Sequence, residues 1–291
     1  MSALDTVKVK RLVKAALPEP ARGWIIERRR EWLDKQLFRR HLRPTDTFIV
    51  AHPKSGNTWL AYMLVVLLQG DRDGRVNMKN LRNYSPHIHH HDSWIADYPA
   101  LADPRVFRNE GPCYPDFYPK ILYLLRDPRA VLISLYHMHN TIFVDKRMSF
   151  EAFLDEYLAY GCIRHWEPWQ TRWDRQVLAW TRRAQRDARI VIVRYEDMVR
   201  DRRAVLARVA QFVGVPRGGE DLALAVDRGS FEAMRRDEEE HGAEAYAPEE
   251  QERGRFVRRG KIDGWRDEID ARSIARIEQA LAPAMRITGY L

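Results

Sequence analysis

Residues 47–59, which read TFIVAHPKSGNTW, are the stretch that decides the fold. The run TFIVA is short and mostly apolar, as expected of a buried strand, and a turn around Gly56 follows it. Residues 58–69 then form a strongly apolar helix. A strand, a tight turn and a helix in this order open a phosphate-binding α/β fold, because the free N–H groups at a helix N-terminus favour an anion.

Apolar runs and helical patterns alternate along the rest of the chain. The further elements predicted are strands at 120–126 and 189–195 and helices at 129–139, 175–186, 201–213 and 273–287. This alternation predicts an α/β fold with a central parallel sheet flanked by helices and a P-loop-like turn after the first strand. The charged run 235–240 (RRDEEE) is expected to be a solvated face or a flexible loop.

The length of 291 residues suits one domain, and we expect the whole of 1–291 to form it. Residues 1–43 are basic, and their pattern predicts an N-terminal helical segment. Such a segment either packs on its own domain or makes weak peripheral contact with a membrane. Residues 71–118 show little periodicity, and long irregular segments of this kind are usually functional.

The composition excludes some classes of protein. The 49 Lys and Arg residues against 41 Asp and Glu give a net charge of +8, and 40 of the basic residues are Arg. The excess points either to a polyanionic partner or to charges on solvated helix faces. Two cysteines, Cys113 and Cys162, exclude a disulfide framework and favour a reducing, cytoplasmic compartment. No apolar run reaches the roughly 20 residues that span a bilayer, so we predict no transmembrane segment and no signal peptide.

The turn after the first predicted strand carries groups that bind phosphate. Lys54 is a cation, Ser55 and Thr58 offer hydroxyls, and Gly56 lets a phosphate approach the backbone closely. Trp59 offers a ring that can stack on a nucleobase. Because the lysine precedes the glycine, the turn does not match the nucleotide-triphosphatase loop GxxxxGK[ST]. Taken alone, the segment also fits an ordinary turn in which Thr58 caps the helix.

The segment PKSGNTW at 53–59 resembles the 5′-phosphosulfate loop of cytosolic-type sulfotransferases, which reads PKSGTTW. Further segments follow in the family's order: YLLRDPRAVLISLYH at 123–137, RYED at 194–197, SFEAM at 230–234 and FVRRGKIDGW at 256–265. On these motifs the chain resembles the sulfotransferases that use 3′-phosphoadenosine 5′-phosphosulfate (PAPS).

The resemblance implies PAPS as the co-substrate, 3′-phosphoadenosine 5′-phosphate (PAP) as the product, and no metal. The residues that it assigns to donor binding are Lys54, Ser55, Gly56, Asn57, Thr58, Trp59, Arg126, Ser134, Tyr195, Phe231, Arg258, Arg259 and Gly260. It implies that Lys54 faces the leaving oxygen and that Ser134 restrains this lysine. Arg126 and Ser134 would grip the 3′-phosphate, and Tyr195 and Phe231 would lie against the adenine. The departures from the family's pattern are Asp127 for Asn, Ala130 for Asp, Gly229 for Thr and the reversed order Asp263-Gly264.

The general base is where the sequence departs most from the family. The family's segment K-T-H aligns with residues 108–110, so that Arg108 stands for Lys and Glu110 for the basic His. A carboxylate can serve as base where burial raises its pKa, and we predict Glu110, Lys54 and Ser134 as the catalytic residues. The rival base is a histidine of the cluster 87–91. We expect no metal there, because no further ligands lie at metal-binding spacing.

The resemblance implies sulfuryl transfer to a hydroxyl, less readily to an amine, of a small-molecule or glycan acceptor. We expect residues 71–118 and 140–170 to form the acceptor side, with contacts from His87, His89, Tyr114 and His137. One alternative is a P-loop-type kinase that uses ATP, with Asp127 and Asp197 as Mg²⁺ ligands. The other is a non-enzymatic protein that binds polyanions. We expect no nucleic-acid partner for the enzyme, and the sequence leaves the oligomeric state open.

Overall fold

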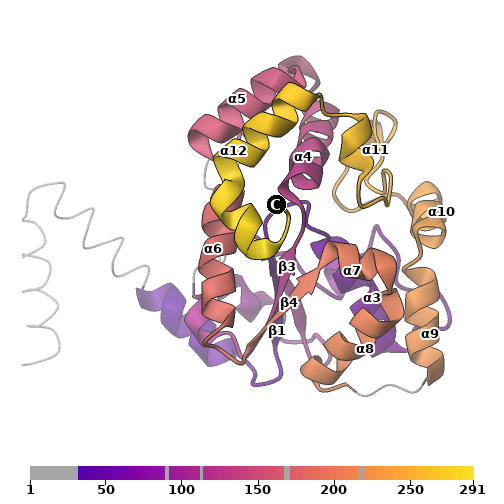
Figure 1. Cartoon of the computed structure of the whole chain (residues 1–291). Coiled ribbons are helices and arrows are strands. Elements are labelled where there is room, and N and C mark those ends of the chain that lie inside the picture. Colours follow the sequence, from indigo (N-terminus) through magenta and orange to yellow (C-terminus); the bar gives the residue numbers. More distant parts are fainter. Residues whose placement is uncertain (1–31, 89–91, 112–113, 167–170, 216–218) are drawn as a thin grey trace, which may run out of the picture. The chain divides into compact units, whose positions relative to one another are not determined.

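The computed structural model describes residues 32–88, 92–111, 114–166, 171–215 and 219–291 (Figure 1). The chain divides into two units, residues 1–42 with 91–99 and residues 43–90 with 100–291. In the first unit, residues 32–41 are helical and Asp92–Asp97 form a 3₁₀ segment. The rest of the predicted N-terminal helical segment, residues 1–31, lies outside the described residues. The single-domain organisation stays a prediction.

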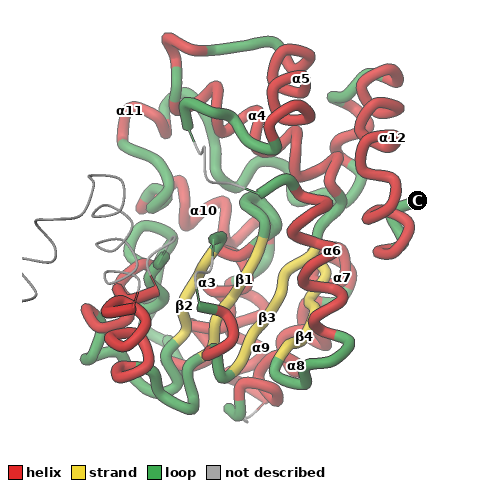
Figure 2. Tube along the Cα trace, turned by 90° about the vertical axis from the view of Figure 1, so that its left-hand side faces the viewer, coloured by secondary structure: helices red, strands yellow, loops and turns green. Residues whose placement is uncertain are grey.

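The second unit is built on a four-stranded sheet whose strands all run parallel (Figure 2). The strands are β1 (Thr47–Ala51), β2 (Val106–Asn109), β3 (Lys120–Leu125) and β4 (Ile190–Arg194), in the order β2-β1-β3-β4. Because the strands are parallel, their carboxyl ends meet at one edge. The residues that follow the four strands, His52, Glu110, Arg126 and Tyr195, therefore leave the sheet at the same edge.

Helices cover both faces of the sheet, which confirms the predicted α/β fold with a central parallel sheet. The helices are α3 (Asn57–Gln69), α4 (Pro128–Ile142), α5 (Phe150–Tyr160), α6 (Trp173–Ala184), α7 (Tyr195–Arg200), α8 (Arg202–Val213), α9 (Gly219–Arg228), α10 (Phe231–His241), α11 (Pro248–Gln251) and α12 (Ala271–Thr288). Helices α3, α8 and α9 pack together on one face, and α6, with α12 against it, lies on the other (Figure 1). Helix α3 is apolar on nearly all sides, and it can therefore be enclosed by the sheet, α8 and α9.

Strand β2 is absent from the sequence-based prediction, which left residues 71–118 as an irregular segment. All four of its residues are buried, although two of them are polar. The Arg108 guanidinium donates to the Ser85 carbonyl at 2.9 and 2.6 Å and pairs with Glu244, and Asn109 donates to the Tyr118 hydroxyl at 3.0 Å. The polar side chains of β2 are buried only because these partners satisfy them. A four-residue strand with such side chains shows no alternation of apolar and polar residues from which it could be predicted.

The charged run 235–240 has the expected solvated side, on which Arg236, Glu239 and Glu240 are exposed, but it is not a loop. It belongs to helix α10, and its Glu238 is buried. The Glu238 carboxylate accepts hydrogen bonds from the backbone N–H of Phe256 at 2.6 Å and of Val257 at 2.8 Å. The expectation of a flexible loop is therefore wrong, because one acid of the run fixes the start of the segment 256–265.

Glu196, in the first turn of α7, ties the edge of the sheet to the last described residues. Its carboxylate accepts the Asp127 N–H at 3.0 Å and the Tyr290 hydroxyl at 2.8 Å. The Arg194 guanidinium donates to the Thr288 carbonyl at 2.8 Å and lies over the Tyr290 ring. The start of α4, the end of β4 and the segment after α12 are thus held by one buried carboxylate.

Replacing Tyr290 by Phe removes one of the two partners of this carboxylate. We expect a loss of about 1–3 kcal/mol in the free energy of unfolding, because a buried acceptor is left unsatisfied. Tyr160→Phe is the matched control, since its ring is exposed and stacks on Arg164, and it should change stability by less than about 0.5 kcal/mol. Urea unfolding of both variants checks this, and equal midpoints would contradict the account.

Candidate functional site

The loop between β1 and α3 turns through two left-handed residues. Lys54 has φ of 66° and Gly56 has φ of 103°. Gly56 is the N-cap of α3 and provides no side-chain cap, and the first turn of α3 carries no acidic residue. The positive end of the helix dipole is therefore not neutralised by the chain's own carboxylates in that turn, which suits an anion.

Tyr195 forms the surface on which this loop rests. A Cβ atom on Gly56 would lie 2.9 Å from the Tyr195 ring, so only glycine allows both the backbone angle and the close approach. The Trp59 ring packs edge-on against the same tyrosine, at 5.3 Å between centroids. The Arg126 guanidinium lies 3.9 Å from the centre of the Tyr195 ring. The end of β4 thus supports the loop through an aromatic contact.

Arg126 leaves the end of β3 and reaches the loop. Its Nη1 donates to the Lys54 carbonyl at 2.8 Å. Its Nε, and the Ser55 hydroxyl beside the same turn, are buried polar atoms with no hydrogen-bond partner in the described part of the chain. A buried donor without an acceptor is costly, and such groups are usually satisfied by a ligand or water. The two orphaned groups fit the oxygens of a phosphate or sulfate.

The start of the loop is held by a chain of hydrogen bonds between neutral groups of His52, Tyr157 and Trp173. His52 Nδ1 donates to the Pro53 carbonyl at 3.1 Å, so its Nε2 accepts from the Tyr157 hydroxyl at 3.1 Å. That hydroxyl accepts in turn from the Trp173 N–H at 2.9 Å. Burial lowers the pKa of His52 to about 4, so that the imidazole stays neutral at pH 7.

Glu110 stands directly after β2 and meets the first residue of α3. The Asn57 side-chain amide donates to Glu110 Oε1 at 2.8 Å, and Gln176 donates to the Glu110 backbone carbonyl at 3.1 Å. His87 Nε2 lies 4.0 Å from the same Oε1. Burial raises the pKa of Glu110 to about 7, although the hydrogen bond from Asn57 and the charge of Lys54 lower it in part. A carboxyl group poised near neutrality can take up a proton in a reaction at pH 7.

A second group of predicted site residues gathers around Glu268, namely Arg258 and Arg259, predicted to bind PAPS, and His137, predicted to contact the acceptor. Arg258 donates to Glu268 Oε1 at 2.5 Å, and His137 Nε2 lies 2.6 Å from Oε2. Arg259 Nε lies 3.4 Å from Oε1 and its Nη1 donates to Asp267 at 2.9 Å. Burial lowers the pKa of His137, which Arg258 lowers further and Glu268 partly restores. In this structure the two arginines are thus neutralised by carboxylates.

One aromatic contact connects the two groups of residues, and another holds the segment 256–265 against the start of α10. Lys54 Nζ lies 4.2 Å from the centre of the Phe256 ring, two residues before Arg258. Phe231 packs so closely on Gly260 that a Cβ atom there would lie 2.4 Å from its ring. Phe256 was missed as a site residue, since an aromatic in an irregular segment carries no signal of its own.

The other predicted residues occupy distinct positions. Thr58 Oγ1 lies 3.5 Å from the Arg108 guanidinium, and the Trp59 indole donates to the Gly229 carbonyl at 2.8 Å. Ser134 is half-buried on α4, and Tyr114 is half-buried beside the 3₁₀ turn Pro115–Phe117. The predicted contact residue His89 lies outside the described residues, as do His90 and His91.

Two residues that sequence comparison could not explain have structural roles. Asp127, which replaces the family's Asn, accepts from the Arg129 N–H at 2.8 Å at the start of α4 and pairs with the Arg129 guanidinium. Gly229, which replaces the family's Thr, faces Met63, and a Cβ atom there would lie 2.4 Å from that side chain. Asp127 thus caps α4, and Gly229 leaves room for Met63.

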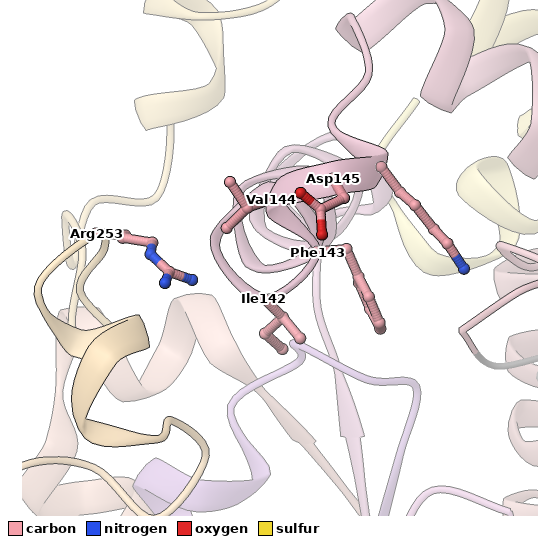
Figure 3. Close-up of a pocket in the computed structure, with 6 residues that line it drawn as sticks. Ile142, Phe143, Val144, Asp145 and Arg253 are labelled. Carbon is pink, nitrogen blue, oxygen red and sulfur yellow. The ribbon is translucent and has the colours of Figure 1, made fainter.

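A pocket of about 430 Å³ lies at the end of α4, within the segment 140–170 (Figure 3). Its lining is Ile142, Phe143, Val144, Asp145, Lys146 and Arg253. The Arg253 guanidinium points across it toward Val144 and Ile142 (Figure 3). The pocket therefore combines apolar walls with charged groups. Elsewhere, the described residues contain no group of three or more side chains placed to hold a metal ion and no helix long and apolar enough to cross a membrane.

Comparison with known proteins assigns the chain to a family. A family model of the sulfotransferase domain matches residues 44–289. Sulfotransferase 4A1 of Mus musculus is 26% identical over 190 residues, which are 60% of this chain and 61% of that protein. Amine sulfotransferase of Oryctolagus cuniculus is 23% identical over 259 residues, covering 84% of this chain and 82% of that protein. The match to Sulfotransferase 4A1 thus spans less than two thirds of that relative.

Solved structures share the fold at low sequence identity. Retinol dehydratase in complex with retinol and PAP has a TM-score of 0.64 and 19% identity, over 84% of this chain and 82% of that chain. Mouse sulfotransferase SULT7A1 complexed with PAP has a TM-score of 0.61 and 18% identity, over 84% and 86%. The family match covers all the residues that build the sheet and the loop, and the chain belongs to the sulfotransferase domain family.

Proposed function

We propose that this protein is a PAPS-dependent sulfotransferase that sulfates a hydroxyl group. The observation that carries the proposal is the pair of buried donors, Ser55 Oγ and Arg126 Nε, left without acceptors beside the uncapped N-terminus of α3. Phosphate oxygens would satisfy both groups. The family match and the presence of PAP in two structural neighbours support the same donor.

The donor supplies an activated sulfuryl group: the acceptor oxygen bonds to sulfur, the bond from sulfur to the phosphate oxygen breaks, and the phosphate keeps the electron pair. The chain's own residues stabilise charge and remove a proton. Lys54 offers a cation at the loop, and Ser134 on α4 is proposed to restrain it. Glu110 takes the proton of the acceptor hydroxyl, supported by its pKa of about 7.

The nucleoside end of PAPS is assigned to aromatic residues beside the loop and to the second group of residues. Trp59, Tyr195 and Phe231 supply aromatic surface for the adenine, and Gly260 closes on Phe231. Arg258 and Arg259 would exchange Glu268 and Asp267 for the 3′-phosphate, since a doubly charged phosphate competes well with a carboxylate for guanidinium.

The acceptor is proposed to be a small molecule or a glycan with a hydroxyl, and less readily an amine. His87 lies 4.0 Å from Glu110, and the pocket at the end of α4, with both apolar and charged lining, is formed mainly by residues of the segment 140–170 that is assigned to the acceptor side. Retinol is bound in one structural neighbour, which supports an apolar alcohol. The contacts of His89, Tyr114 and His137 with the acceptor, a cytoplasmic location and weak membrane contact stay predictions.

The kinase alternative needs Asp127 and Asp197 as Mg²⁺ ligands, and the partners of these two residues weaken it. Asp127 is bound to Arg129 and caps α4, and Asp197 pairs with Arg200 at 3.2 Å. Both carboxylates are engaged by arginine, so that neither stands ready as a Mg²⁺ ligand. The non-enzymatic alternative accounts for the net charge but not for a buried carboxyl with a pKa near 7 beside a phosphate loop.

Arg126→Lys tests the donor site. Lysine keeps the charge but cannot present a guanidinium fork to both the Lys54 carbonyl and a phosphate. We expect PAP affinity to fall about 10- to 100-fold, as charged hydrogen bonds are worth about 1.5–3 kcal/mol each. Isothermal titration calorimetry measures the affinity of each variant for PAP. Arg189→Lys, at a surface pair with Asp187, is the control, and an Arg126→Lys affinity equal to that of the control would refute the assignment.

Glu110→Gln tests the base. The amide keeps the shape of the side chain but cannot take the acceptor's proton. With ³⁵S-labelled PAPS and the best acceptor from a panel of phenols, alcohols and sugars, we expect turnover to drop by about 10²- to 10⁴-fold while PAP affinity is kept. Glu240→Gln, exposed on α10, is the control. Full turnover by Glu110→Gln, with loss in His87→Gln, would move the base to the histidine.

A further inference from the structure

Two residues that depart from the family's motifs are bonded to each other. Asn57 stands in the phosphate loop where the pattern PKSGTTW has Thr, and Glu110 stands where the family has its basic His. They are 53 positions apart, and the Asn57 amide donates to Glu110 Oε1 at 2.8 Å. The register between β1 and β2 places them together, since Val50 pairs with Asn109.

The orientation of Asn57 is fixed by a second hydrogen bond. The Thr58 N–H donates to Asn57 Oδ1 at 2.9 Å, so the NH₂ group of the amide must face Glu110. Asn57 is buried as the first residue of α3. An NH₂ group can only donate, and it therefore favours the ionised carboxylate over the protonated one.

Other charged and titratable groups face Glu110 from three elements. Lys54 acts from the loop, Arg108 from β2, and His87 Nε2 lies 4.0 Å from Oε1. Arg108 is already paired with Glu244. Within the described residues, the bond from Asn57 is the only hydrogen bond that reaches the Glu110 carboxylate, and Oε2 accepts none.

We propose that Asn57 is a positioning residue, which holds Glu110 by Oε1, leaves Oε2 to receive the proton of the acceptor hydroxyl, and couples the base to the phosphate loop. This inference rests on the proposed function for its meaning in catalysis. The hydrogen bond itself does not depend on it, and the two are tested separately.

Loss of the Asn57 bond should make Glu110 harder to ionise. Its pKa would rise from about 7 by about one unit, because the bond from Asn57 favours the ionised carboxylate and its loss removes that preference. The base is active when deprotonated. At pH 7 the active fraction would then fall about fivefold, and near pH 9 it would recover almost fully.

The direct test is infrared titration of the Glu110 carboxyl, which needs neither donor nor acceptor. The difference between wild type and Glu110→Gln assigns the C=O band of the protonated acid. We expect a midpoint near pH 7 in wild type and about one unit higher in Asn57→Ala. Equal midpoints in the two proteins would overturn the proposal. If Asn57→Ala does not fold, Asn57→Thr, the residue of the family's loop, replaces it with the same expectation.

Gln176→Leu is the matched control. Gln176 touches the backbone carbonyl of Glu110 and not its carboxylate, and its own Oε1 has no partner in the described residues, so leucine fits chemically. The midpoint should not move. A shift as large as that of Asn57→Ala would show that any loosening around Glu110 is sufficient, which would overturn a specific role for Asn57.

Kinetics then separate positioning from donor binding. Asn57→Ala should lose turnover at pH 7 and regain it near pH 9, and in a Glu110→Gln background it should add no further loss. A loss that is equal at all pH values and adds to that of Glu110→Gln would overturn the coupling. Should Glu110→Gln keep full turnover while the infrared midpoint still shifts, the proposed function of Glu110 fails and the Asn57 bond stands.

Discussion

The site depends on one tight turn, in which the chain reverses from β1 into α3 over the ring of Tyr195. Two left-handed residues, Lys54 and Gly56, make the turn, and the lack of a side chain at Gly56 lets it rest on the tyrosine. This geometry points the Lys54 carbonyl at Arg126 and the first residue of α3 at Glu110. A larger residue at Gly56 would lift the loop from its support and separate these partners.

The parallel sheet provides the second constraint. Because all strands end at one edge, residues far apart in the sequence come together there: Glu110 after β2, the turn with Lys54 and Gly56 after β1, Arg126 after β3 and Tyr195 after β4. The same edge is buried enough to raise the pKa of Glu110 to about 7. The position of β2 beside β1 therefore determines both the burial of Glu110 and its place next to the loop.

Much of this arrangement could be predicted from residues that carry a local signal. The run TFIVA, the glycine turn and the apolar helix gave β1, the loop and α3, and the hydrophobic runs at 120–126 and 189–195 gave β3 and β4. Strand β2 could not be predicted, since it is short and its buried polar residues, Arg108 and Asn109, are satisfied by tertiary contacts with Glu244 and Tyr118. Phe256 and Glu268 could not be predicted as site residues for the same reason, because their roles come from tertiary contacts with Lys54 and Arg258. Glu110 was found through its departure from the family's motif, but its bond to Asn57 needed the structure.

We propose that the loop and its neighbours bind a sulfuryl donor without metal. Calorimetry that compares PAP with ATP, each with and without Mg²⁺, tests this claim most directly. The account predicts that PAP binds more tightly than ATP and that Mg²⁺ leaves PAP binding unchanged, since cationic side chains and the helix N-terminus provide the charge. Tighter binding of ATP that requires Mg²⁺ would contradict it.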